Sequence, residues 1–188
     1  MGAQQAGKGR ANALKAPLTV RIEEPCKAPA EVVYGLVADL RRHMEWAGEM
    51  QPKKNFRLAS MEAPEGEATV GTEFRTVGAD PSGRFTDASV VTEAIRPREF
   101  EFVTEAHLDT KKGRGVDWTN VHRYEVVPDG EGSRIAYALR VERISDLPGS
   151  MAALKVPGLR GMAGKISASY MRRGLKNLVK LAEQRASA

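Results

Sequence analysis

The side chains best suited to proton transfer or hydrogen bonding with a small molecule are a histidine and two tyrosines in neighbouring segments. His122 and Tyr124 stand two residues apart, and Tyr137 lies in the segment that follows. An imidazole ordinarily titrates near neutral pH and can act as a general acid or base, and a phenol can polarise a carbonyl group. Asp87, in an earlier segment, could orient the imidazole. We therefore take His122, Tyr124 and Asp87 as candidate catalytic residues, with a purely structural, hydrogen-bonded His122 as the alternative.

Composition and motifs exclude several other kinds of site. The single cysteine, Cys26, cannot form an internal disulfide bond or a paired-cysteine zinc site, and three scattered histidines make no ligand cluster. The phosphate-binding Gly-x-x-x-x-Gly-Lys-Ser/Thr, the Gly-x-Ser-x-Gly and the His-Glu-x-x-His motifs are absent from the sequence. We expect neither a metal nor a cofactor. One cysteine, no membrane-length apolar run and no signal-peptide pattern favour the cytoplasm.

Alternating apolar and polar residues predict that the candidate residues lie on strands. A first strand begins at Leu18 and is ended by Pro25, and Pro29 suits the first residue of a short helix. A second short helix runs towards Trp46. Turn sequences containing proline and glycine separate the later segments. Six further strands are expected at residues 56–61, 70–77, 85–95, 99–106, 116–127 and 134–144, and a closing helix at 162–184.

Side chains alternate between the two faces of a strand, so their parity selects those that face inward. In strand 116–127 the face that holds Asn120 and His122 is larger and less charged than the other. Apolar walls with a few polar groups are typical of a small-molecule site. The candidate ligand-binding residues are Trp46 (at the mouth), Phe74 (with Val70 on the same face), Phe100, Phe102, Trp118, Asn120, Tyr137, Leu139, Met162 and Ile166. For Met162 and Ile166, plain core packing is an equal alternative.

Charge is unevenly distributed along the chain. The net charge is +5, yet residues 1–16 carry three basic residues without an acid, and the segment from Lys155 carries eight basic residues and one acid. Such ends could contact nucleic acid or an anionic membrane, but basic residues beside an apolar helix stripe mostly face water. Because no stacking aromatic residues accompany the charges, we expect no specific nucleic-acid binding and only weak contact with anionic membranes. We interpret residues 1–16 as a flexible basic tail and residues 17–188 as one ligand-binding domain, monomeric or homodimeric.

Short motifs follow one another in an order that resembles a known superfamily. They lie at residues 28–34, 39 with 46, 70–75, 91–94, 96–97, 100–102, 124–135, and 174–178 with 183. In this order they resemble the SRPBCC superfamily of START-like and birch-pollen-allergen-like proteins, and most closely its polyketide cyclase/dehydrase-like branch. Each motif is weak alone, and their order along most of the chain carries the resemblance.

The resemblance implies a helix-grip fold of the α+β class. In this fold a curved seven-stranded antiparallel sheet wraps around a long C-terminal helix, with two short helices after the first strand. A hydrophobic or aromatic small molecule would occupy a cavity between sheet and helix, without metal or cofactor. If the protein is an enzyme, cyclisation or dehydration of a polyketide-like substrate is expected. The alternatives are a non-catalytic lipid or isoprenoid carrier and a partner-binding START-like protein.

Overall fold

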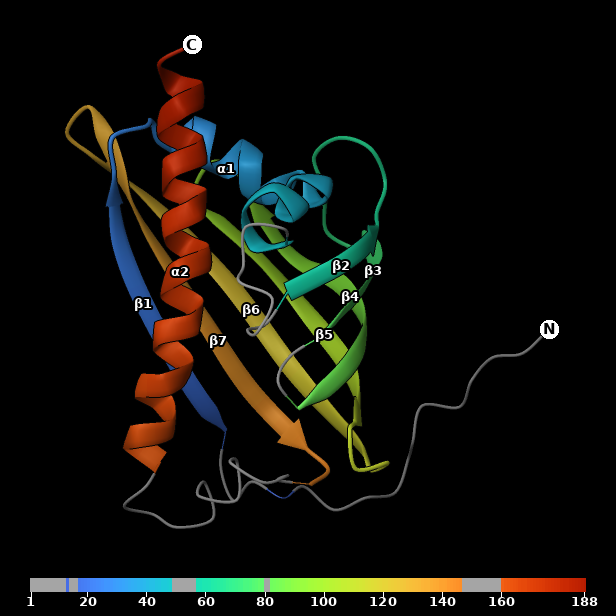
Figure 1. The fold of residues 1–188 in the computed structure, drawn as a ribbon. Helices are drawn as coiled ribbons and strands as arrows, with labels where there is room; N and C mark the ends of the chain where they lie inside the picture. Colours follow the sequence, from blue (N-terminus) through green and yellow to red (C-terminus); the bar gives the residue numbers. More distant parts are fainter. Residues whose placement is uncertain (1–12, 14–16, 49–56, 80–81, 147–159) are drawn as a thin grey trace.

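Seven strands form one curved antiparallel sheet in the computed structural model, and a long helix lies across its concave face (Figure 1). The structure describes residue 13 and residues 17–48, 57–79, 82–146 and 160–188, without the side chains of residues 160–167 and 170. The strands are β1 (Leu18–Cys26), β2 (Arg57–Glu62), β3 (Glu73–Ala79), β4 (Gly83–Ile95), β5 (Glu99–Thr110), β6 (Gly115–Asp129) and β7 (Gly132–Ile144). The helical segments are α1 (Ala30–Ala38), the short turns η1 (Leu40–Arg42) and η2 (Met44–Gly48), and α2 (Arg160–Ala186).

The order of strands in the sheet is β1-β7-β6-β5-β4-β3-β2, so the chain crosses only once, from β1 at one edge to β2 at the other. The α2 helix packs along β1 and against α1 and η2 (Figure 1). Its buried side chains Leu175, Leu178 and Ala182 are three or four residues apart, which gives the helix one apolar stripe. The expected α+β fold, with its seven-stranded antiparallel sheet and long C-terminal helix, is confirmed. None of the described helices is long and apolar enough to cross a membrane.

Two expectations about strand ends are wrong. The first strand does not end before Pro25, because β1 continues to Cys26 and Pro25 pairs with Arg134 of β7. A proline is tolerated there because β1 is an edge strand, which needs no N–H donor for a further neighbour. Val70 lies in a turn before β3 and is 61% exposed, so it does not share the inward face with Phe74. Gly71 beside it has a φ of 88°, a conformation that favours glycine and interrupts the alternation.

Buried apolar side chains form two clusters on the concave side. The larger, here called the main cluster, joins α1, α2 and the sheet and includes Val33, Phe100, Tyr124, Ile135, Leu175 and Leu178. The smaller, here called the end cluster, consists of Phe85, Leu108, Val116 and Ile144. Ala13 packs on the end cluster and donates its backbone N–H to the carbonyl of Ile144 (2.8 Å). At least this part of the predicted tail therefore contacts the domain.

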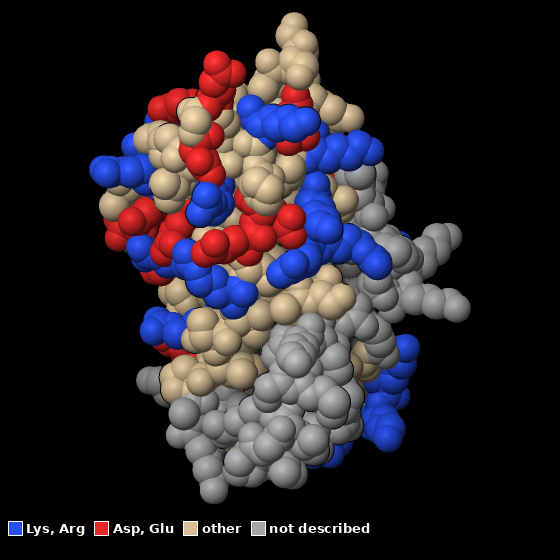
Figure 2. Space-filling view, turned by 90° about the vertical axis from the view of Figure 1, so that its left-hand side faces the viewer, with Lys and Arg blue, Asp and Glu red and all other residues tan. Residues whose placement is uncertain are grey.

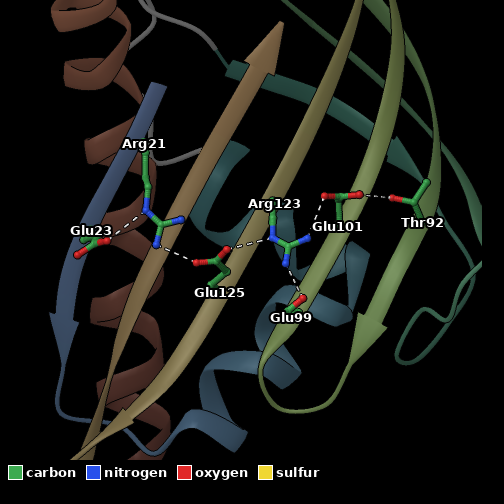
Figure 3. A network of polar contacts seen from close by, with 7 residues as sticks. All are labelled: Arg21, Glu23, Thr92, Glu99, Glu101, Arg123 and Glu125. Atoms are coloured by element: carbon green, nitrogen blue, oxygen red, sulfur yellow. Dashed lines mark hydrogen bonds and ion pairs between the residues drawn. The ribbon is translucent and has the colours of Figure 1, made fainter. Parts of the chain in front are cut away.

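Paired charges run across the convex face of the sheet (Figure 3). This convex ladder comprises Arg21, Glu23, Thr92, Glu99, Glu101, Arg123 and Glu125. Arg21 of β1 reaches Glu125 of β6 across the intervening strand β7, with 2.8 Å between Nη2 and Oε2. At the register positions between them, β7 presents only Ala136 and Ala138. Two small side chains thus allow the ion pair to span three strands.

Candidate functional site

Aromatic rings stack on the concave face of the sheet. Phe102 of β5 lies flat against His122 of β6, with ring centroids 4.6 Å apart, and Tyr124 of β6 lies flat against Tyr137 of β7 at 4.5 Å. The register explains both contacts, because Phe102 pairs with His122 and Tyr124 with Tyr137, and directly paired residues share a face. Parity counting from the sequence thus selected four residues that lie side by side. We call Phe102, His122, Tyr124 and Tyr137 the aromatic stack.

A hydrogen bond and ring stacking connect three members of the stack. The Nδ1 atom of His122 lies 2.8 Å from the hydroxyl of Tyr137, whose ring stacks on that of Tyr124. Tyr137 therefore orients the imidazole, and the expectation that Asp87 does so is wrong. Asp87 lies on β4, with β5 between it and the strand of His122, and its Oδ2 accepts a hydrogen bond from Thr76 Oγ1 (3.1 Å).

Burial keeps the stack uncharged at neutral pH. Loss of solvation lowers the pKa of His122 to about 3, and the neighbouring His43 adds to this shift. Burial also raises the pKa of Tyr124 and of Tyr137 above the ordinary value. The imidazole is therefore neutral at pH 7 and offers hydrogen bonds more readily than a proton. The premise that this histidine titrates near neutrality does not hold for the folded protein.

Five polar side chains cross the concave face from β3 to β6, between the aromatic stack and the end cluster. We call Thr76, Asp87, Ser89, Thr104 and Asn120 the polar row. The hydroxyls of Ser89 and Thr104 are 2.8 Å apart, and burial raises the pKa of Asp87 to about 6. Asp87 Oδ1 and Asn120 Oδ1 are buried and have no hydrogen-bond partner in the described part of the chain. Such groups are uncommon in folded proteins and need an explanation.

On β6 and β7 the middle of the concave face is less completely covered than its ends, whereas Thr76, Ser89 and Thr104 on β3 to β5 are buried. In the main cluster Phe100 and Ile135 are at most 1% exposed. Inward-facing residues around the polar row are only partly buried, namely Trp118, Asn120, His122, Tyr137, Leu139 and Val141. Inward side chains of a filled core are close-packed and almost fully buried. This part of the concave face is therefore accessible from outside the domain.

His43 also contacts the stack, although no sequence pattern pointed to it. It lies between η1 and η2, is 4% exposed, and places its ring 4.6 Å from that of Trp46 and 6.5 Å from that of Tyr124. Its Nε2 donates a hydrogen bond to the carbonyl of Val37 (2.7 Å), and burial lowers its pKa to about 4. Strand parity could not reveal this residue because it lies in an irregular turn. Its spacing of three from Trp46 was the available signal.

Trp46 closes the stack on its η2 side and does not sit at a pocket mouth as expected. It is 3% exposed, and its ring meets Tyr124 edge-on with centroids 6.0 Å apart. Its carbonyl accepts a hydrogen bond from Asn177 of α2 (3.1 Å). Its indole Nε1 is buried and has no hydrogen-bond partner among the residues described.

The remaining candidate ligand residues fall into three groups. Phe74 and Phe100 are buried in the main cluster, where Phe74 meets Phe102 edge-on at 5.2 Å. Trp118 and Leu139 are partly buried on the concave face, beside the polar row and the stack respectively. The side chains of Met162 and Ile166 lie outside the described residues. Among the residues that the structure describes, no group of three or more histidine, cysteine, aspartate or glutamate side chains could hold a metal ion.

Comparison with known families agrees with this architecture. The family model described as "Polyketide cyclase / dehydrase and lipid transport" matches residues 17–183. The chain belongs to this family. The match spans all the described strands and almost all of α2, and the family is of the SRPBCC type that the order of motifs resembles. No curated protein matches the chain.

Solved structures share the fold at low sequence identity. A protein from Thermus thermophilus is 22% identical, with a TM-score of 0.60 over 90% of this chain and 99% of that one. A Rhizobium leguminosarum protein is 14% identical, with a TM-score of 0.62 over 89% and 95% of the two chains. Major latex-like protein 151 of Panax ginseng is 11% identical, with a TM-score of 0.57 over 89% and 98%. At these identities the likeness shows the fold alone.

Proposed function

We propose that the protein binds a hydrophobic or aromatic small molecule on the concave face of its sheet, against the aromatic stack and beside the polar row. The observation that carries this proposal is the partial exposure of inward-facing residues such as His122, Leu139 and Val141, where a filled core would bury them. Flat rings supply apolar contact area, and a few polar groups beside them fix orientation. Membership in a family of cyclases, dehydrases and lipid transport proteins supports the same interpretation.

Two hollows on the surface suit such a ligand less well. One, of about 390 Å³, is lined by Gly113, Arg114, Gly115, Ser145 and Asp146. The other, of about 260 Å³, lies on the convex face and is lined by Arg21, Glu23, Glu125, Val127, Pro128, Asp129, Arg134 and Ala136. Their walls are mostly charged or polar, so an apolar molecule would gain little by entering them.

A charge placed on the concave face tests the proposal. Leu139→Lys puts an ammonium group beside the stack, whereas Thr119→Lys puts the same group on the convex side of β6, beside Glu105. We expect a fluorescent fatty-acid analogue to bind the parent protein and Thr119→Lys at micromolar strength, and to bind Leu139→Lys at least tenfold more weakly. Native mass spectrometry of protein from its own host would identify the retained molecule. Equal binding by the two lysine variants would place the ligand elsewhere and overturn the proposal.

A second candidate function, cyclisation or dehydration of a polyketide-like ligand, is favoured by the hydrogen bond between His122 and Tyr137 and by the stacking of Tyr124 on Tyr137. In this reaction the stack would hold a flexible polyketone folded, and much of the acceleration would come from positioning. A tyrosine hydroxyl would donate a hydrogen bond to a carbonyl oxygen, and the neutral imidazole would accept the proton released on enolisation. The low pKa of His122 makes it a weak base, which is why binding is the first proposal.

The catalytic role depends on the imidazole. His122→Gln keeps a polar side chain of similar reach and removes the titratable ring, so turnover of a polyketone should fall about a hundredfold while its affinity changes little. Unchanged turnover would exclude the role. A ligand that is bound and released chemically unaltered by the parent protein would favour the carrier alternative.

A further inference from the structure

Two buried oxygen atoms on the concave face accept no hydrogen bond from any residue that the structure describes. They are Oδ1 of Asp87 on β4 and Oδ1 of Asn120 on β6. The other carboxylate oxygen of Asp87 is bonded to Thr76, and Ser89 and Thr104 are bonded to one another. The polar row thus satisfies some of its own groups and leaves two buried acceptors, one on β4 and one on β6, without a donor among the described residues.

The two acceptors are close enough to contact one molecule. Asp87 pairs with Ala106 of β5, and Asn120 pairs with Thr104, two residues away on the same face of β5. Two strand spacings of ~4.8 Å and two residues of ~3.4 Å place the Cα atoms about 12 Å apart, and side chains on the concave face of a curved sheet converge. On β5, opposite Asp87, stands the small side chain of Ala106.

The residues around Asp87 and Asn120 indicate which chemical group of a ligand would pair with their two oxygen atoms. On one side lie the rings of Phe102 and His122, and on the other lies the end cluster with Trp118 packed against it. Among the residues that the structure describes, none that is basic hydrogen-bonds or forms an ion pair with Asp87. A desolvated carboxylate that lacks a cationic partner repels an anionic head group and favours a hydrogen-bond donor.

We propose that the bound molecule presents hydrogen-bond donors, hydroxyl or N–H, to Asp87 Oδ1 and Asn120 Oδ1 while its apolar or aromatic body lies against the aromatic stack. This inference rests on the proposed binding function and specifies the ligand class. It selects hydroxylated or amino-bearing aromatic and polycyclic molecules. It disfavours free fatty acids bound with their carboxylate at the polar row, so an acid that binds must place its head elsewhere.

Matched probes separate this inference from the binding function itself. Isothermal titration calorimetry at about pH 7.5 would compare 2-naphthol with 2-methoxynaphthalene, which has the same ring and no donor. We expect the parent protein to bind 2-naphthol at least tenfold more tightly. A third probe, 2-(aminomethyl)naphthalene, distinguishes a cationic donor from a hydroxyl, since whichever of the two binds more tightly identifies the head group.

Variants of nearly the same side-chain shape test whether Asp87 and Asn120 cause the preference for 2-naphthol. Asp87→Leu and Asn120→Leu each remove one acceptor, and each should reduce the preference for 2-naphthol to less than threefold while binding 2-methoxynaphthalene at least as well as the parent. Retained binding of that probe shows that the variant is folded. Thr119→Val, on the convex face next to Asn120, should keep the full preference.

The outcomes are distinct. Equal affinity of the parent protein for the three probes would overturn the donor inference and leave the binding proposal standing. A preference that survives in both leucine variants would also overturn it. Absence of binding by every probe would overturn both.

Discussion

Acid affects the three histidines in opposite ways because their surroundings differ. His43 and His122 lie among rings and carry lowered pKa values. His107 lies on the convex face with Nδ1 2.6 Å from Asp117 and Nε2 3.3 Å from Asp109, and these carboxylates raise its pKa. The folded state therefore resists protonation at the first two residues and favours it at the third.

Replacing His122 by glutamine should make the protein less sensitive to acid. The unfolded chain takes up a proton near pH 6.5, whereas the folded protein takes it up only near pH 3, so stability is lost as pH falls below 6.5. At 1.36 kcal/mol per pKa unit, the parent loses about 2 kcal/mol through this residue between pH 6.5 and 5. Urea unfolding at both pH values should show that His122→Gln escapes most of this loss.

His107→Gln is the control with the opposite sign. Its raised pKa means that His107 contributes stability below the unfolded pKa and loses it as pH rises through the folded value. The free energy of unfolding of this variant should therefore be lower than that of the parent at pH 5 and nearly equal to it at pH 8. Acid profiles that coincide for the parent and His122→Gln would contradict the lowered pKa and neutral state of His122.

Asp87 should cost stability at neutral pH. Its folded pKa of about 6 lies above the ordinary 3.8, so stability falls as pH rises between these values, by at most about 3 kcal/mol. Asp87→Asn removes the charge and should raise the free energy of unfolding at pH 7.5 by roughly 1 to 3 kcal/mol. This increase in the free energy of unfolding, relative to the parent, should disappear near pH 4. A variant that is destabilised at pH 7.5 would show that the carboxylate is stabilised within the fold after all.

At the scale of the elements, the convex ladder depends on one arginine. Arg123 bonds Glu99, Glu101 and Glu125, so Arg123→Gln leaves three neighbouring carboxylates with less compensation. We expect a loss of about 1 kcal/mol in the free energy of unfolding, smaller in 1 M salt. Arg134→Gln, which breaks a single exposed pair with Asp129, should cost much less. Equal effects of the two variants in denaturant titrations would contradict a cooperative ladder.

Strand periodicity predicted most of the elements because the sheet has one apolar face. Residues 116–127 alternate without interruption and residues 134–144 alternate up to the bulge at Glu142, and β6 and β7 follow them with a few residues added at the ends. The end of the first strand was predicted wrongly because the effect of a proline depends on whether its strand is central or at the edge of the sheet. Pro25 breaks a central strand but not an edge strand, a position that single-sequence reasoning cannot assign.

The candidate site was predictable in part for the same reason. Parity alone places His122, Tyr124 and Tyr137 on one face, and register then determines which rings touch. Register depends on bulges, such as the one in β7 opposite Thr119 and Asn120, which no local pattern encodes. The partner of the imidazole and the contact of His43 with the stack depend on tertiary packing, so the sequence did not reveal them.

Across the whole molecule, charge of both signs is mixed. The net charge is +5, and Figure 2 shows acidic and basic side chains interspersed on one face, many of them in ion pairs. The electrostatic field of interspersed acidic and basic side chains attracts polyanions weakly, and salt at physiological concentration screens it beyond about 8 Å. We expect no submicromolar binding of DNA or RNA in fluorescence anisotropy at about 150 mM salt. Sequence-dependent submicromolar binding would contradict this, whereas binding of anionic liposomes alone would favour the lipid-carrier alternative.

We expect the separation of the main cluster from the end cluster to make folding less cooperative than one continuous core would. Among the described residues, the two clusters are joined across the polar row by backbone pairing and by few apolar side chains, such as Trp118 and Val141. Local opening at the end cluster therefore needs less free energy than global unfolding, and amides near Leu108 and Val116 exchange with solvent sooner than those near Tyr124. A molecule that touches both the stack and the polar row bridges the two clusters. Binding of such a molecule should therefore couple the unfolding of the two clusters and slow amide exchange at the end cluster.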